Sequence, residues 1–226
     1  MLTKIGHRGA MGYAPENTLM SFNKAIELGV DMVELDVHVC ETGELVVIHD
    51  ETVDRTTDGH GNVAEKTLQE LQKFDAGKGE HIPTLLEVLE FIDRKIKINI
   101  ELKGKKTSQP TCKVIEEYVR DRQWLYDDFL VSSFDYDELR VCRTLNRSIP
   151  LGVLISEQQF NYAQITKELS AIAVIPEYLL VNEKYVNDAH ERGLQVMVWT
   201  VNEKNNIARM KQMGVDGIIS NFPDRL

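Results

Sequence analysis

Short apolar segments alternate with amphipathic helical segments along almost the whole 226-residue chain. Eight of the apolar segments have the length and the β-branched residues of buried strands, and these lie at 4–7, 32–38, 96–102, 129–133, 151–154, 171–175, 195–200 and 217–220. Apolar residues with helical spacing predict the intervening helices at 19–28, 85–92, 112–122, 136–145, about 157–169, 184–192 and 204–213. Strands joined by helical crossovers run parallel, so this order predicts a (β/α)8 TIM barrel in one domain, residues 1–226. A doubly wound open sheet is the competing α/β arrangement.

A further apolar segment at 45–48 breaks the alternation, because only a short turn at Thr42 and Gly43 separates it from the strand at 32–38. A parallel crossover needs about a dozen residues or more, so we expect 45–48 to fold back as an antiparallel hairpin arm. If Thr42 and Gly43 form a two-residue turn, Asp36 pairs with His49 and both side chains lie on one face of the hairpin. The irregular stretch at about 51–82 predicts a small insertion after the second barrel strand, with one or two helical turns near 68–74.

Unusual polar residues fall where strands end, and in either parallel fold the ligand site lies at the carboxyl ends of the strands. Glu34 and Asp36 share one face of their strand, and Glu101 and Lys103 share one face of the next. Burying an unpaired charge costs several kcal/mol, so these acids indicate a site. Their hard oxygen ligands suit Mg²⁺ or Ca²⁺ better than Zn²⁺, and we assign Glu34, Asp36 and Glu101 to a divalent metal. The alternative is a buried salt-bridge network with Arg8 and Lys103.

Two histidines at strand ends are candidates for proton transfer, because an imidazole titrates near pH 6.5 and serves as acid or base at neutral pH. These are His7, which ends the first strand, and His49, which follows the hairpin arm. His38 lies on the Asp36 face but nearer the hairpin turn, and we expect a structural role for it.

Arg8 and Lys103 are candidates for holding a phosphate, Arg8 by its bidentate fork and Lys103 as a point charge. Their other role would be charge balance for the acids. Trp199, at the end of the strand at 195–200, either walls the substrate pocket or belongs to the apolar core.

The charge and composition narrow the classes of partner. The net charge of -10 provides no basic field for nucleic acid or an anionic membrane, so we expect a small-molecule substrate. The first residues, Met-Leu-Thr-Lys-Ile-Gly-His, contain no apolar signal core, and we expect a cytoplasmic protein. The three cysteines have no metal-type spacing and are expected to be free thiols.

The motifs resemble those of the glycerophosphodiester phosphodiesterases over nearly the whole chain. They are, in order, His7-Arg8-Gly9, Pro15-Glu16-Asn17-Thr18, Glu34-Leu35-Asp36-Val37, Val46-Val47-Ile48-His49-Asp50, Arg55-Thr56-Thr57, Ile82-Pro83-Thr84-Leu85, Glu101-Leu102-Lys103 and Val198-Trp199-Thr200-Val201-Asn202. The family fold is a (β/α)8 barrel with a small insertion after the second strand, which agrees with the pattern above.

The resemblance implies a role for each matched site residue. His7 and His49 would be the acid/base pair, with His7 favoured as base. Arg8 and Lys103 would contact the phosphate, and Glu16 would orient Arg8 or the metal site, or else be structural. The metal ligands would be Glu34, Asp36 and Glu101.

The implied reaction is hydrolysis of a deacylated phospholipid, such as glycerophosphocholine or glycerophosphoethanolamine, to glycerol 3-phosphate and an alcohol. The attacking group would be water or the substrate's own neighbouring hydroxyl. A lysophospholipase D-like hydrolase and a catalytically inactive phosphodiester-binding barrel are the rival interpretations. The sequence leaves the preferred headgroup, the working metal and the oligomeric state open.

Overall fold

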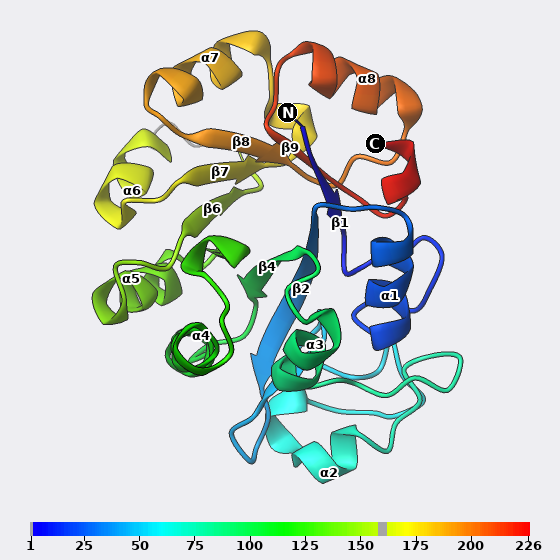
Figure 1. Ribbon diagram of the computed structural model, residues 1–226. Coiled ribbons are helices and arrows are strands. Elements are labelled where there is room, and N and C mark those ends of the chain that lie inside the picture. Colours follow the sequence, from blue (N-terminus) through cyan, green and yellow to red (C-terminus); the bar gives the residue numbers. More distant parts are fainter. Residues whose placement is uncertain (1, 158–161) are drawn as a thin grey trace.

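A closed ring of parallel strands forms the centre of the protein (Figure 1). The computed structural model describes residues 2–157 and 162–226. Each of the eight barrel strands pairs in parallel with the next barrel strand along the chain, and the first also pairs with the last, which closes the barrel and excludes the open sheet. The barrel strands are β1 (Thr3–Gly6), β2 (Met32–Val39), β4 (Lys97–Leu102), β5 (Phe129–Ser133), β6 (Leu151–Ile155), β7 (Ala173–Pro176), β8 (Gln195–Val198) and β9 (Gly217–Ser220). The predicted TIM barrel is confirmed.

The helices between the barrel strands lie on the outside of the barrel (Figure 1). They are α1 (Leu19–Glu27), α3 (Leu85–Ile92), α4 (Ser108–Asp121), α5 (Tyr136–Leu145), α6 (Tyr162–Leu169), α7 (Glu183–Glu191) and α8 (Lys204–Gln212). Helix α4 begins four residues before its predicted start, because Pro110 in its first turn gives up an N–H that has no helical partner there. The predicted helix at about 157–169 is observed from Tyr162 onward, and its part at 158–161 lies outside the described residues.

Apolar side chains fill the barrel interior below the polar carboxyl ends of the strands. On β2, for example, the inward positions run from Met32 through Glu34 to Asp36, so the apolar floor gives way to acids along one strand. The floor consists of Ile5, Met32, Leu130, Leu154, Ala173, Ile175, Met197 and Ile219. Within the described part of the chain, no helix is both long enough and apolar enough to cross a lipid bilayer.

The hairpin register differs by one residue from the prediction. Strand β3 (Leu45–Val47) is antiparallel to β2, and the N–H of Ile48 donates to the carbonyl of Asp36, so Asp36 pairs with position 48 rather than with His49. The loop holds three residues, 41–43, because Gly43 adopts φ +97° and donates its N–H to Cys40 in the manner of a three-residue hairpin. The predicted pairing of Asp36 with His49 is therefore wrong.

The insertion after β3 has a small core of its own. It contains a 3₁₀ turn, η1 (Val63–Glu65), and one short helix, α2 (Leu68–Leu71), which lies beyond α3 at the margin of the barrel (Figure 1). The insertion ends at a bridge between Val46 of β3 and Thr84. Its core contains Cys40, Val46, Ile48, Val53, Val63, Leu71, Ala76 and Ile82.

We expect Thr84→Ala to lower the free energy of unfolding by about 1 kcal/mol. Thr84 caps α3: its hydroxyl accepts from the Glu87 N–H at 3.2 Å, and its own N–H donates to the Glu87 carboxylate at 2.7 Å. Thr67 makes the same capping box on α2, which has only four residues, so Thr67→Ala should cost less. Urea unfolding followed by circular dichroism measures both, and an equal cost at the two sites would contradict this expectation.

Candidate active site

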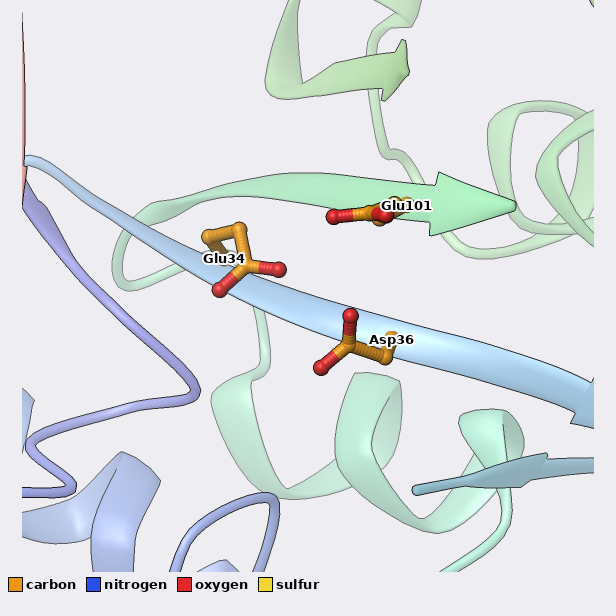
Figure 2. A group of neighbouring side chains, drawn as sticks. All are labelled: Glu34, Asp36 and Glu101. Carbon is orange, nitrogen blue, oxygen red and sulfur yellow. The ribbon is translucent and has the colours of Figure 1, made fainter. Parts of the chain in front are cut away.

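Three carboxylates from two neighbouring strands converge at the carboxyl end of the barrel. Glu34 and Asp36 project from β2 and Glu101 from β4, whose register places Asp36 beside Glu101. Figure 2 shows the three side chains projecting into one space between the strands. One oxygen of each lies within 4.8 Å of the others, and all three residues are buried. Burial, followed by repulsion from Asp36, raises the pKa of Glu101 to about 7, and the same two causes raise the pKa of Glu34 well above its usual range.

The nearby cations satisfy only part of this cluster. Lys103 Nζ lies 2.8 Å from Glu101 Oε1, and Arg8 Nε lies 3.4 Å from Asp36 Oδ2. Among the described residues, Glu34 Oε1 and Asp36 Oδ1 nevertheless have no hydrogen-bond partner. Buried hard oxygens without partners fit a divalent cation, so the acidic triad is able to hold one.

His7 stands at the end of β1 with one ring nitrogen occupied. Its Nδ1 lies 2.6 Å from Asn221 Oδ1, and its Nε2 lies 3.9 Å from Glu34 Oε2. Burial, assisted by the Arg8 charge, lowers the pKa of His7 to about 4. The ring is therefore neutral at neutral pH. Sequence reasoning missed Asn221, although this residue directly follows the strand ending at Ser220 and the strand-end rule would have found it.

His49 reaches the barrel mouth from the hairpin arm. Its Nδ1 lies 2.5 Å from Asp50 Oδ1, and its carbonyl lies 3.1 Å from His38 Nε2, which holds the backbone there. His38 is buried, in accord with its expected structural role. Hydrogen bonds from Arg55 hold the pKa of Asp50 well below its usual range, so Asp50 is an ionised partner for the ring. The sequence motifs contain both Asp50 and Arg55 but indicate no role for either residue.

The loop after β1 holds Arg8 in place. Arg8 has φ +49°, a left-handed conformation that is strained for a residue with a side chain, and its N–H donates to Glu34 Oε2 at 2.9 Å. Its Nη1 donates to Glu16 Oε1 at 2.7 Å. Glu16 thus contacts Arg8 and lies outside the acidic triad. This position is compatible with its predicted role of orienting Arg8. Asn17 donates to Asp36 Oδ2 at 2.9 Å, a contact that sequence reasoning missed.

Trp199 lies both in the pocket wall and against the barrel floor. Its Nε1 donates to the carbonyl of Ile175 at 2.9 Å. Its ring meets that of Phe134 edge-on at 5.5 Å. Lys103 Nζ lies 5.6 Å from the centre of the Phe134 ring. Phe134 also follows a strand end and was not predicted as a site residue.

A cavity of about 80 Å³ brings most of these groups together. Two of the predicted site residues do not line this cavity: Asp36 lies beside it as a member of the acidic triad, and Glu16 contacts Arg8 from behind. A larger hollow of about 690 Å³ opens at the other end of the barrel, but it contains neither the acidic triad nor either site histidine. The 80 Å³ cavity is lined by His7, Arg8, Glu34, His49, Asn99, Glu101, Lys103, Phe134, Leu154, Trp199, Thr200 and Ile219.

A TIM barrel with acidic, basic and imidazole groups gathered at the carboxyl ends of its strands has the construction of a barrel enzyme. Residues 7–225 match the family model described as the glycerophosphoryl diester phosphodiesterase family. The chain belongs to this family, and the resemblance seen in its motifs is confirmed.

Relatives with related names match over nearly the full length. A glycerophosphodiester phosphodiesterase of Caldanaerobacter subterraneus subsp. tengcongensis is 37% identical, over 98% of this chain and 95% of its own. A human lysophospholipase D is 25% identical, over 98% of this chain and 84% of its own. Among solved structures, an Oleispira antarctica phosphodiesterase in complex with the product sn-glycerol-3-phosphate has a TM-score of 0.91 at 30% identity, over 99% of this chain and 95% of that one.

Proposed function

We propose that the protein hydrolyses glycerophosphodiesters, such as glycerophosphocholine and glycerophosphoethanolamine, to glycerol 3-phosphate and the free alcohol. The observation that carries this proposal is one small cavity lined by two histidines, two cations and two acids of the buried acidic triad, a triad with oxygens that lack partners among the described residues. The family match supports the reaction class, and the Oleispira phosphodiesterase was solved with the corresponding product. A cytoplasmic location and the absence of nucleic-acid and membrane partners stay predictions.

The hydrogen bonds of the two histidines support an acid/base pair. Asn221 Oδ1 and the Asp50 carboxylate only accept, so the Nδ1 of each ring carries the hydrogen and the Nε2 is left for the substrate. His7, neutral because its pKa is about 4, accepts a proton from the attacking oxygen. His49 acts in its doubly protonated form: its Nδ1–H stays with the ionised Asp50, and the proton on its Nε2 passes to the leaving alcohol.

The charged groups of the cavity would bind the phosphate. Arg8 would contact the phosphate oxygens through the guanidinium N–H groups that do not face Glu16 and Asp36, and Lys103 would contact them through its ammonium group. A Mg²⁺ or Ca²⁺ ion held by Glu34, Asp36 and Glu101 would supply positive charge against the phosphoryl group as its charge builds up. Water and the neighbouring glycerol hydroxyl both remain candidate nucleophiles, and phosphorus NMR separates them because only the second route forms a cyclic phosphate.

The size of the cavity separates this function from its rivals. At about 80 Å³, with charged and polar side chains set beside four apolar ones, it suits a phosphate with a short polyol better than a lysophospholipid, although the likeness to a human lysophospholipase D keeps that activity as a second candidate. An inactive binding barrel is disfavoured because both histidines and all three acids are present in one site.

An assay of metal-stripped protein tests the proposal. We expect glycerol 3-phosphate to form from glycerophosphodiesters only after Mg²⁺ or Ca²⁺ is added, and at least about tenfold faster than lysophosphatidylcholine is cleaved, since the cavity that holds the two histidines is only about 80 Å³. The measurements are enzymatic detection of glycerol 3-phosphate and of free choline. The absence of glycerol 3-phosphate with every metal, or cleavage of the lysophospholipid alone, would overturn the proposal.

A further inference from the structure

Arg55, in the insertion, bridges two carboxylates that lie behind the active site. Its Nε and Nη2 donate to the two oxygens of Asp50 at 2.6 and 3.0 Å. Its Nη1 and Nη2 donate to the two oxygens of Glu16 at 2.9 and 2.8 Å. Both acids are therefore held in bidentate pairs by two edges of one guanidinium, a geometry that only arginine provides.

Each of these carboxylates in turn holds one active-site side chain. Asp50 Oδ1 lies 2.5 Å from His49 Nδ1. Glu16 Oε1 accepts from Arg8 Nη1 at 2.7 Å, and Arg8 Nε continues to Asp36 at 3.4 Å. Arg55 is thus linked to His49 through Asp50 and to Arg8 through Glu16. His49 approaches the cavity from the hairpin arm, and Arg8 approaches it from the loop after β1.

The backbone around Arg55 does not depend on this bridge. Val53 is fully buried in the insertion core, its N–H donates to the carbonyl of Gly61 at 3.1 Å, and the Thr57 N–H donates back to Val53 at 3.1 Å. The Arg55 side chain is itself about half exposed, at 48%. Removal of its side chain should therefore free the two carboxylates without unfolding the insertion.

We propose that Arg55 is a positioning residue that fixes His49 and Arg8 together, through Asp50 and Glu16, without touching the substrate. The inference rests on the proposed function. With Arg55 absent, Asp50 is free to rotate away from the imidazole, and His49 loses the alignment that proton donation requires. Glu16 likewise loses the partner that holds it against Arg8, and the phosphate contact loosens.

The decisive experiment compares two leaving groups. Glycerophosphoethanolamine releases an alkoxide that needs a proton from His49, whereas the 4-nitrophenyl ester of glycerol 3-phosphate releases a phenolate that does not. We expect Arg55→Ala to lower kcat about 10–100-fold on the first substrate, the size seen when a residue supporting a reactive group is lost. On the nitrophenyl ester we expect kcat to fall by less than about fivefold. The activity retained on this substrate also shows that the variant is folded.

Two further variants separate the arms of the bridge. Asp50→Ala should reproduce the leaving-group pattern of Arg55→Ala, and the double variant should be no worse than the poorer single one, because both changes break one path. Glu16→Gln should instead raise KM for both substrates through Arg8. Arg55→Lys keeps the charge without the fork and should resemble Arg55→Ala.

Arg140 provides a matched control. It bonds Glu168 at 2.7 Å and Asp137 at 2.6 Å, is 44% exposed and lies on α5 outside the barrel, so Arg140→Ala should leave both rates unchanged. Equal losses on the two substrates, multiplying effects in the double variant, or wild-type behaviour of Arg55→Lys would overturn the inference. If wild-type protein itself releases no glycerol 3-phosphate, the proposed function has failed instead.

Discussion

Replacement of His7 by alanine is expected to lower kcat for glycerophosphodiester hydrolysis by about 10²–10⁴-fold, the range that a positioned general base supplies. His7 is neutral because burial lowers its pKa to about 4, and its Nδ1 is bound to Asn221, so the proton acceptor that is lost is Nε2. The measurement is the initial rate of glycerol 3-phosphate release at saturating substrate and metal.

The same leaving-group comparison assigns the two histidines. His49→Ala should lose most of its activity on glycerophosphoethanolamine but little on the 4-nitrophenyl ester, whereas His7→Ala should lose activity on both, since activation of the nucleophile is needed in either case. The opposite pattern would exchange the roles of acid and base. His60, which is 85% exposed and paired with Asp54 at 3.3 Å, is the control, and His60→Ala should match the wild type.

The strands and helices of the barrel could be predicted from the sequence, because the apolar residues of each element repeat with the spacing of a strand or of a helix. The helix at 85–92 and the strands at 129–133 and 217–220 match their predicted bounds, since capping residues and β-branched runs are local signals. The register of the hairpin could not be predicted from the sequence. It depends on whether two or three residues form the loop, and Gly43 is compatible with both until its φ is known.

The acids of the candidate site could be predicted from the sequence for a physical reason, whereas the residues that support the site could not. Glu34 and Asp36 stand out because charged side chains on a buried strand face are costly without a purpose. Asn221 has the signal of a strand end, but its role follows only from its contact with His7, 214 positions away in the chain. Arg55 lies in the irregular insertion, and its role follows from contacts with Asp50, five positions away, and with Glu16, 39 positions away. His49 was chosen from its place after a strand, and it lines the cavity although the pairing used to place it was wrong.

Metal binding and protonation should compete at the acidic triad. The folded pKa of Glu101 is about 7, whereas an unfolded Glu titrates near about 4.3. Between these values the folded state holds a proton that the unfolded state has released, so the contribution of Glu101 to stability falls as pH rises toward 7. A divalent ion binds the deprotonated acids, so its stabilising effect should increase over the same range.

The measurement is the melting temperature at pH 5 and pH 8, with a chelator or with excess Mg²⁺ or Ca²⁺. His7 acts in the opposite sense, because its lowered pKa removes stability as pH falls from about 6.5 to about 4, and the comparison with Glu101→Gln removes this contribution. In the chelator, Glu101→Gln should lose less stability than the wild type between pH 5 and pH 8, because the amide does not ionise.

The same variant should lose metal-dependent activity by more than about 100-fold, beyond the 10–100-fold typical of residues that only support a ligand. It should also lose most of the metal-induced rise in melting temperature at pH 8, because one of three buried carboxylates is no longer available to the ion. Glu191→Gln, at an exposed position of α7 outside the barrel, should retain both properties. If Glu101→Gln binds and uses the metal as the wild type does, Glu101 is a partner of Lys103 and the ion is held elsewhere.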